Sequence, residues 1–114
     1  MMKKLNLLFI SLLIINLTHA QWTQLGGDID GEAAGDCSGW SVSLSSDGSV
    51  VAIGAISNDG NGTEAGHVRV YENQSGIWTQ TGGDIDGEAA YDISGRTVSL
   101  SSDGSVVAIG ATCN

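Results

Sequence analysis

Hydrophobic and polar residues alternate over a short stretch in the first half of the chain, residues 40–44 (WSVSL). Trp40, Val42 and Leu44 fall on one side of an extended backbone, and the serines fall on the other. Side chains of a strand point alternately to its two faces, so this pattern predicts a half-buried β-strand. We expect its hydrophobic side to face the protein interior.

Two further stretches complete most of a sheet. Residues 50–55 (VVAIGA) are apolar or small throughout, which is typical of a strand buried on both faces. Residues 67–72 (HVRVYE) alternate again, and we expect Val68 and Val70 to point inward. The opposite face of this strand then carries His67, Arg69 and Tyr71.

Turns rich in glycine and polar residues separate these stretches. The pair Asp47-Gly48 suits a tight hairpin that needs a positive φ. Residues 73–76 (NQSG) provide a second turn, and residues 77–81 (IWTQT) a fourth strand. All 17 glycines follow residue 20 and the chain has no proline, a composition that indicates many tight turns and little helix. The sequence therefore predicts an all-β fold with four short antiparallel strands in each unit.

The chain also repeats itself. Residues 22–58 and 78–114 are identical at 30 of 37 positions, so a unit of 56 residues is duplicated. Four antiparallel strands in each repeated unit are the anatomy of a β-propeller blade. We interpret residues 21–77 as a first complete repeat and residues 78–114 as a second, truncated one. Since a propeller needs about four to eight blades, we expect a fragment whose further blades come from a full-length chain or from other chains.

The first 20 residues have the pattern of a secretory signal peptide. Lys3 and Lys4 precede an apolar run from Leu5 to Leu17. The segment ends on Thr18-His19-Ala20, with small residues at the two positions that a signal peptidase reads. A membrane anchor is the alternative, but this run is shorter than the roughly 18–20 residues that cross a bilayer. We expect an exported protein, secreted or at the cell surface, with no membrane span in the mature chain.

Removal of the leader makes the chain strongly acidic. Arg69 and Arg96 remain against 13 acidic residues, which gives a net charge of −11. Nucleic-acid binding depends on Lys and Arg that neutralise phosphates, so the charge argues against nucleic acid as a partner. Two cysteines, Cys37 and Cys113, are too few for a disulfide scaffold, and the sequence leaves their pairing open.

The order of these motifs resembles a known repeat. The stretch "SGWSVSLSSDGSVVAIGA", followed by "GHVRVYEN", is similar to the FG-GAP repeat of integrin alpha-chain propellers, with WD40 blades as the alternative for the fold. The full unit also resembles tandem repeats of large secreted proteins of marine Bacteroidetes. The resemblance implies a β-propeller blade and a calcium loop between the first two strands. This sequence departs from it there, because that loop holds a single acid, Asp47.

Alternating acidic residues occur in both copies of "GDIDGE" and are weak candidates for calcium ligands. Calcium prefers six to eight oxygen ligands around a sharp turn, and carboxylates supply them. The competing interpretation is an exposed acidic linker whose side chains cap turns, and the shortness of each segment favours it. Calcium is the one cofactor that the sequence suggests, and the candidate ligands are Asp28, Asp30, Glu32, Asp84, Asp86 and Glu88.

His67 is the single histidine after the leader, and no second histidine or cysteine accompanies it. It is therefore poor evidence for a zinc site or for a catalytic triad, and we predict no catalytic residues. Trp22 and Trp78 occupy the same position of the repeat, and we expect both to pack within the blades.

These observations support two functions. The first is a non-enzymatic, exported β-propeller repeat protein that acts in adhesion or extracellular binding, with a protein or a glycan as its ligand. The alternative is a propeller domain of a secreted, polysaccharide-degrading enzyme whose catalytic part lies outside this chain. A degraded reading frame without function is a third interpretation.

Overall fold

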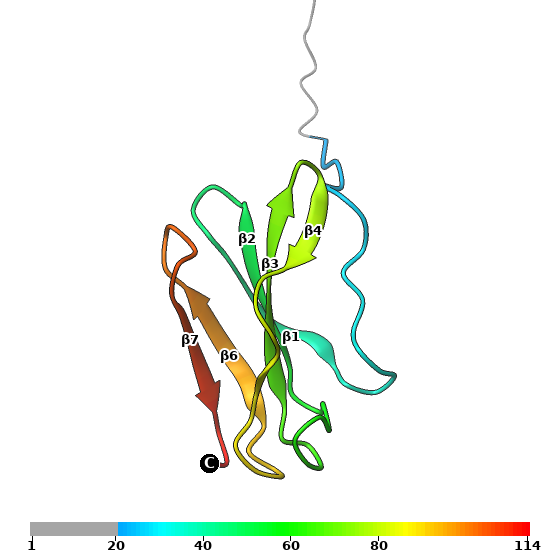
Figure 1. Ribbon diagram of the computed structural model, residues 1–114, viewed down its shortest axis with the longest axis vertical. Coiled ribbons are helices and arrows are strands. Elements are labelled where there is room, and N and C mark those ends of the chain that lie inside the picture. The colour runs from blue at the N-terminus through cyan, green and yellow to red at the C-terminus, as the bar shows by residue number, and fades with distance from the viewer. Residues whose placement is uncertain (1–20) are drawn as a thin grey trace, which may run out of the picture.

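The computed structural model describes residues 21–114, so the predicted signal peptide lies outside the described residues. Four strands form the main sheet: β1 (Ser38–Leu44), β2 (Val50–Ala55), β3 (His67–Gln74) and β4 (Ile77–Gln80). They follow each other in the order β1-β2-β3-β4, and every neighbouring pair is antiparallel (Figure 1). This is the four-stranded blade that the alternation of the sequence predicts.

A fifth short strand, β5 (Ile85–Asp86), pairs with the beginning of β3, beyond the end of β4. The second repeat supplies a separate two-stranded sheet, β6 (Ser94–Leu100) and β7 (Val107–Ala111), which lies beside the first sheet in Figure 1. Residues 21–114 contain no helix, so the predicted all-β class is confirmed for this part of the chain.

The two sheets are joined through serine and glycine. The Ser41 hydroxyl on β1 donates a hydrogen bond to the Gly95 carbonyl on β6 at 2.6 Å. The Leu100 N–H donates to the Ser43 hydroxyl at 3.0 Å, and the hairpin tips are linked from the Ser46 N–H to the Ser102 carbonyl at 2.8 Å. The polar side of β1 therefore forms the contact with the second repeat.

The expected orientation of β1 is wrong for this reason. Val42 is 63% exposed and Leu44 is 59% exposed, and Trp40 is also exposed. Their neighbours Ser41 and Ser43 are half-buried instead. A strand has only two faces, and here the small polar residues lie on the side that the second sheet covers.

The core of the first sheet consists of small side chains. Buried hydrophobic residues are found on β2, on β3 and in the loop between them, and they are Val51, Ala52, Ala55, Ala65 and Val68. The prediction of a buried strand at residues 50–55 is thus confirmed. Small residues fill the core because the second sheet approaches β2 closely: a Cβ added at Gly54 would overlap the carbonyl oxygen of Gly95.

The two equivalent tryptophans lie in different surroundings. Trp22 is 97% exposed, so the expectation that it packs within a blade is wrong. Trp78 on β4 is half-buried, and its indole N–H donates to the Leu25 carbonyl at 2.7 Å. That bond fastens the segment before β1 to the outer strand. Within the described residues, no strand equivalent to β3 comes before Trp22, so Trp22 has no neighbouring strand on which to lie.

Candidate functional site

His67 is the centre of a polar cluster at the start of β3. The alternation of the sequence places His67 on the face of β3 opposite the inward valines. His67 is nevertheless buried, since only 3% of it is exposed. The cause is the acidic linker, which runs past β3, and β5, which pairs Asp86 directly with His67. The imidazole Nδ1 is buried and has no hydrogen-bond partner among the described residues.

Three carboxylates converge on this nitrogen from different segments. Glu32 Oε2 of the linker and Asp84 Oδ2 of the β4–β5 connection each lie 3.8 Å from His67 Nδ1, and Asp86 Oδ1 lies 3.9 Å from it. These distances exceed those of a hydrogen bond, but they place three carboxylate oxygens around one ring nitrogen. We call Glu32, His67, Asp84 and Asp86 the His67 cluster.

Arg69, the next residue on the same face of β3, neutralises part of this charge. Its Nε and one terminal nitrogen each donate to a different oxygen of Asp84 at 2.7 Å, and the same terminal nitrogen lies 3.1 Å from Glu32. The hydrogen bonds from Arg69 lower the pKa of Asp84 to about 2, and the hydrogen bond to Asp84 raises the pKa of Arg69. Three carboxylates and one guanidinium leave the cluster with an excess of negative charge.

Asn58 positions Glu32 from below the cluster. The buried Asn58 amide donates to Glu32 Oε2 at 3.0 Å and to Asp36 Oδ2 at 2.8 Å, and the Gly60 N–H donates to its carbonyl oxygen at 2.9 Å. The loop after β2 therefore holds the acidic linker against β3. A hollow with a volume of about 240 Å³ lies beside these residues.

The six predicted calcium ligands lie in three places, of which the third is the surroundings of Glu88. Glu32, Asp84 and Asp86 lie together in the His67 cluster, although they come from different copies of "GDIDGE". Asp28 is exposed and accepts a hydrogen bond from Gln24 at 2.8 Å, and Asp30 is exposed. Whether any of the six binds calcium stays a prediction.

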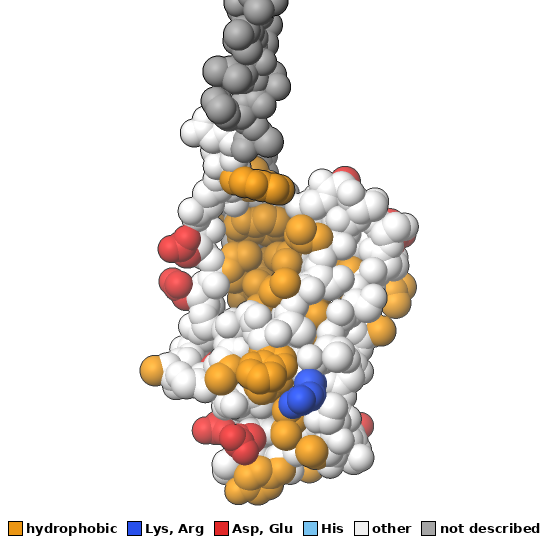
Figure 2. Space-filling view, turned by 180° about the vertical axis from the view of Figure 1, so that it is seen from behind, with side chains coloured by type: hydrophobic (Ala, Val, Ile, Leu, Met, Phe, Trp, Pro, Cys, Tyr) orange, Lys and Arg blue, Asp and Glu red, His pale blue; other side chains and the backbone are white. Residues whose placement is uncertain are grey.

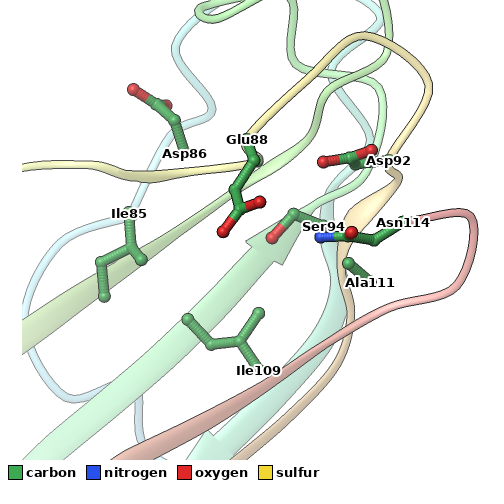
Figure 3. Close-up of a pocket in the computed structure, with 9 residues that line it drawn as sticks. Ile85, Asp86, Glu88, Asp92, Ser94, Ile109, Ala111 and Asn114 are labelled. Carbon is green, nitrogen blue, oxygen red and sulfur yellow. The ribbon is translucent and has the colours of Figure 1, made fainter.

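Glu88 lines a second hollow, which is the counterpart of the first in the second repeat. Figure 3 shows its carboxylate directed toward Ser94, with Asp92 and Asn114 on the far side of the hollow. Asp92 and Asn114 correspond to Asp36 and Asn58 of the first repeat. The repeat therefore builds a similar acidic hollow twice.

The β1–β2 hairpin, where integrin-type repeats carry calcium, has a different structure. Asp47 Oδ1 accepts hydrogen bonds from the Ser45 hydroxyl, the Ser49 N–H and the Ser49 hydroxyl at 2.7–2.9 Å. These bonds, from Ser49 above all, lower the pKa of Asp47 to about 2. Asp103 makes the equivalent bonds in the second repeat. The acid organises the turn, as Asp does in many short loops.

The comparison with protein families agrees with this architecture. Residues 29–71 match the family model described as FG-GAP repeat, which confirms the resemblance for the segment that contains β1, β2 and most of β3. No curated protein and no solved structure was found to match the chain.

The FG-GAP repeat is a non-catalytic repeat type and is typical of extracellular proteins. Among residues 21–114 there is also no helix of the length and hydrophobicity that crossing a membrane requires. Fold and family match together describe an all-β protein in which residues 29–71 match the FG-GAP repeat.

Proposed function

We propose that this protein is an exported, non-catalytic β-propeller repeat protein that acts in adhesion or extracellular binding. The observation that carries the proposal is the match of residues 29–71 to the FG-GAP repeat, because this segment contains β1, β2 and most of β3 of the four-stranded blade. The leader pattern of residues 1–20 supports export. Repeats of this type supply rigid surfaces, and their loops and strand faces carry the contacts with ligands.

The exposed side of β1 is the surface that we assign to binding. Val42 and Leu44 are exposed side by side along the strand, and the Trp40 ring lies 5.8 Å from the guanidinium of Arg96. Figure 2 shows hydrophobic side chains beside a basic one on one face of the molecule. An aromatic ring with an adjacent cation suits a protein or glycan ligand, since it combines a flat apolar surface with a hydrogen-bond donor.

The same faces also suit further blades. In the second repeat, a Cβ added at Gly95 or Gly104 would meet the first repeat, whereas nothing lies within 4 Å of a Cβ built at the equivalent Gly39 and Gly48. The second repeat thus uses this surface to contact the first repeat. The first repeat has the equivalent surface, and no other described residue covers it. We propose a further repeat, from a longer chain or from a second copy, as the alternative occupant of this face, in place of an extracellular ligand.

Export is tested by expression of the full chain in a secreting bacterial host. We expect the protein in the periplasm or medium, with Gln21 as its N-terminus by mass spectrometry. An uncleaved chain that stays in the cytoplasm would contradict the proposal.

Binding is tested on the purified secreted protein with a glycan array and with size-exclusion chromatography coupled to light scattering. The double variant Val42→Ser/Leu44→Ser should lose glycan binding or self-association, whereas the control Ile77→Ser, exposed on β4, should not. Equal behaviour of both variants would exclude the β1 face as the binding surface.

A further inference from the structure

The His67 cluster combines two features that do not belong together in a merely structural network. One is a histidine that is 3% exposed with a buried Nδ1 lacking a hydrogen-bond partner in the described part of the chain. The other is the approach of three carboxylate oxygens to that same nitrogen. A buried polar atom without a partner is unfavourable, and proteins generally provide one.

We infer that Glu32, His67 and Asp84 form a binding site for a divalent metal ion with mixed nitrogen and oxygen ligands, of the class that Zn²⁺ represents. One ligand atom from each residue lies within 4.8 Å of the others. Two ligands of one zinc ion are about 3.3–3.5 Å apart, given bonds of about 2.0–2.2 Å in tetrahedral geometry. The site therefore needs only a small contraction.

Glu32 is the side chain that must move most. It is 46% exposed and belongs to the linker, so its carboxylate can turn and offer Oε1 to the ion while Oε2 keeps its hydrogen bond from Asn58. His67 is already fixed by its place on β3, between Ala55 on β2 and Asp86 on β5. With the imidazole fixed by β3 and Asp84 held by Arg69, movement of the Glu32 carboxylate allows the bond lengths to adjust without a change in the sheet.

The charge of the cluster also favours a divalent cation. Glu32, Asp84 and Asp86 carry three negative charges, and Arg69 compensates one of them. An ion of charge +2 would neutralise the remainder. Arg69 does not block the site, because each carboxylate oxygen has two lone pairs and Asp84 Oδ2 can accept from Arg69 and bind a metal at once.

The imidazole ligand distinguishes this site from a calcium site. Calcium takes oxygen ligands, whereas imidazole nitrogen suits Zn²⁺ and related transition metals. The location is also separate from the β1–β2 hairpin, where Asp47 is occupied by three donors from the turn. The ion would join the linker, β3 and the β4–β5 connection, and this proposal does not depend on the protein's role in adhesion.

The test uses the full chain after treatment with a chelator, with Zn²⁺ alone as the probe. Isothermal titration calorimetry should show one strong site, and His67→Gln or Glu32→Gln should weaken it by at least about tenfold. Glu88→Gln, at the position of Glu32 in the second repeat, is the matched control and should bind as the parent does.

Two further measurements keep the result decisive. Circular dichroism shows whether a variant is folded, and Glu32→Gln replaces an exposed side chain with one of the same size. Substitution with Co²⁺ should give visible absorption bands that His67→Gln abolishes. Zinc binding that survives both His67→Gln and Glu32→Gln would overturn the site, and so would binding of Ca²⁺ in preference to Zn²⁺.

Discussion

Gly54 on β2 and Gly95 on β6 lie back to back at the contact between the two sheets, and neither position has room for a side chain. A Cβ on Gly54 would overlap the Gly95 carbonyl oxygen, and a Cβ on Gly95 would come within 3.1 Å of the Gly54 Cα. The pair lies beside the hydrogen bond from the Ser41 hydroxyl to the same carbonyl. This close approach of two backbones determines how one repeat lies on the next.

Gly54→Ala should therefore separate the sheets and destabilise the protein by about 1–3 kcal/mol, as overpacking of a closed contact does. Gly110→Ala is the matched control, because Gly110 is the equivalent residue of the second repeat and its added Cβ would meet only Thr97. The Thr97 side chain can turn away, so we expect a smaller effect. Urea unfolding measures both, and equal losses of stability would contradict this role for Gly54.

A second prediction compares two equivalent valines, one on the exposed side of β1 and one on the covered side of β6. Val42→Thr on β1 should change the free energy of unfolding by less than about 0.5 kcal/mol, since Val42 is exposed. Val98→Thr at the equivalent position of β6 should destabilise by about 1 kcal/mol, because that residue is half-buried beside the first repeat. A larger loss for Val42→Thr would show that the β1 face is covered in solution.

A third prediction concerns backbone strain in the second repeat. Tyr91 has a φ of 68°, a left-handed conformation that is unfavourable for a side chain, and its counterpart in the first repeat is Gly35 with a φ of 85°. Tyr91→Gly should stabilise the protein by about 0.5–1 kcal/mol, since Tyr91 is exposed and has little packing to lose. Thermal unfolding measures the change.

The reverse substitution is the control. Gly35→Tyr places a side chain where nothing lies within 4 Å of the added Cβ, so only the positive φ opposes it. It should destabilise the protein by about 1 kcal/mol. If the two substitutions had effects of the same sign, backbone conformation would not be the cause.

The strands and hairpins of this fold were predictable because each depends on neighbours in the sequence. Alternation located β1 and β3, the apolar run located β2, and Asp47-Gly48 located the turn between β1 and β2. Which face of β1 is covered was not predictable from the same pattern. A period of two separates the faces of a strand, but it does not reveal that serine and glycine form the contact between repeats, with Val42 and Leu44 left outside.

The His67 cluster was predictable only in part. The duplication of "GDIDGE" implies that acidic segments flank the first repeat on both sides, and Glu32 and Asp84 are members of these two segments. Their meeting at one histidine depends on the pairing of β5 with β3 and on the course of the linker, which are tertiary features. The burial of His67 and the bidentate contact of Arg69 with Asp84 follow from that arrangement.

The pKa of Asp84 predicts how stability depends on pH. Because Arg69 lowers the folded-state pKa of Asp84 from 3.8 to about 2, ionised Asp84 stabilises the native state above about pH 4. That contribution is lost as the pH falls from 4 to 2, where the carboxyl group becomes protonated in the native state as well. Asp84→Asn should therefore destabilise by about 1 kcal/mol at pH 6, since solvent screens a partly exposed ion pair.

At pH 2 most of the difference in the free energy of unfolding between the parent and Asp84→Asn should have disappeared, because about half of the native Asp84 and nearly all of the unfolded Asp84 are then protonated. Urea unfolding at pH 6, 4, 3 and 2 follows the convergence. Asp28→Asn is the control and should show no such trend. Asp28 is exposed, and its side chain accepts a hydrogen bond from Gln24. A difference between parent and Asp84→Asn that is constant from pH 6 to 2 would mean that the ion pair with Arg69 does not stabilise the fold, and the carboxamide would then act only through its altered hydrogen bonds.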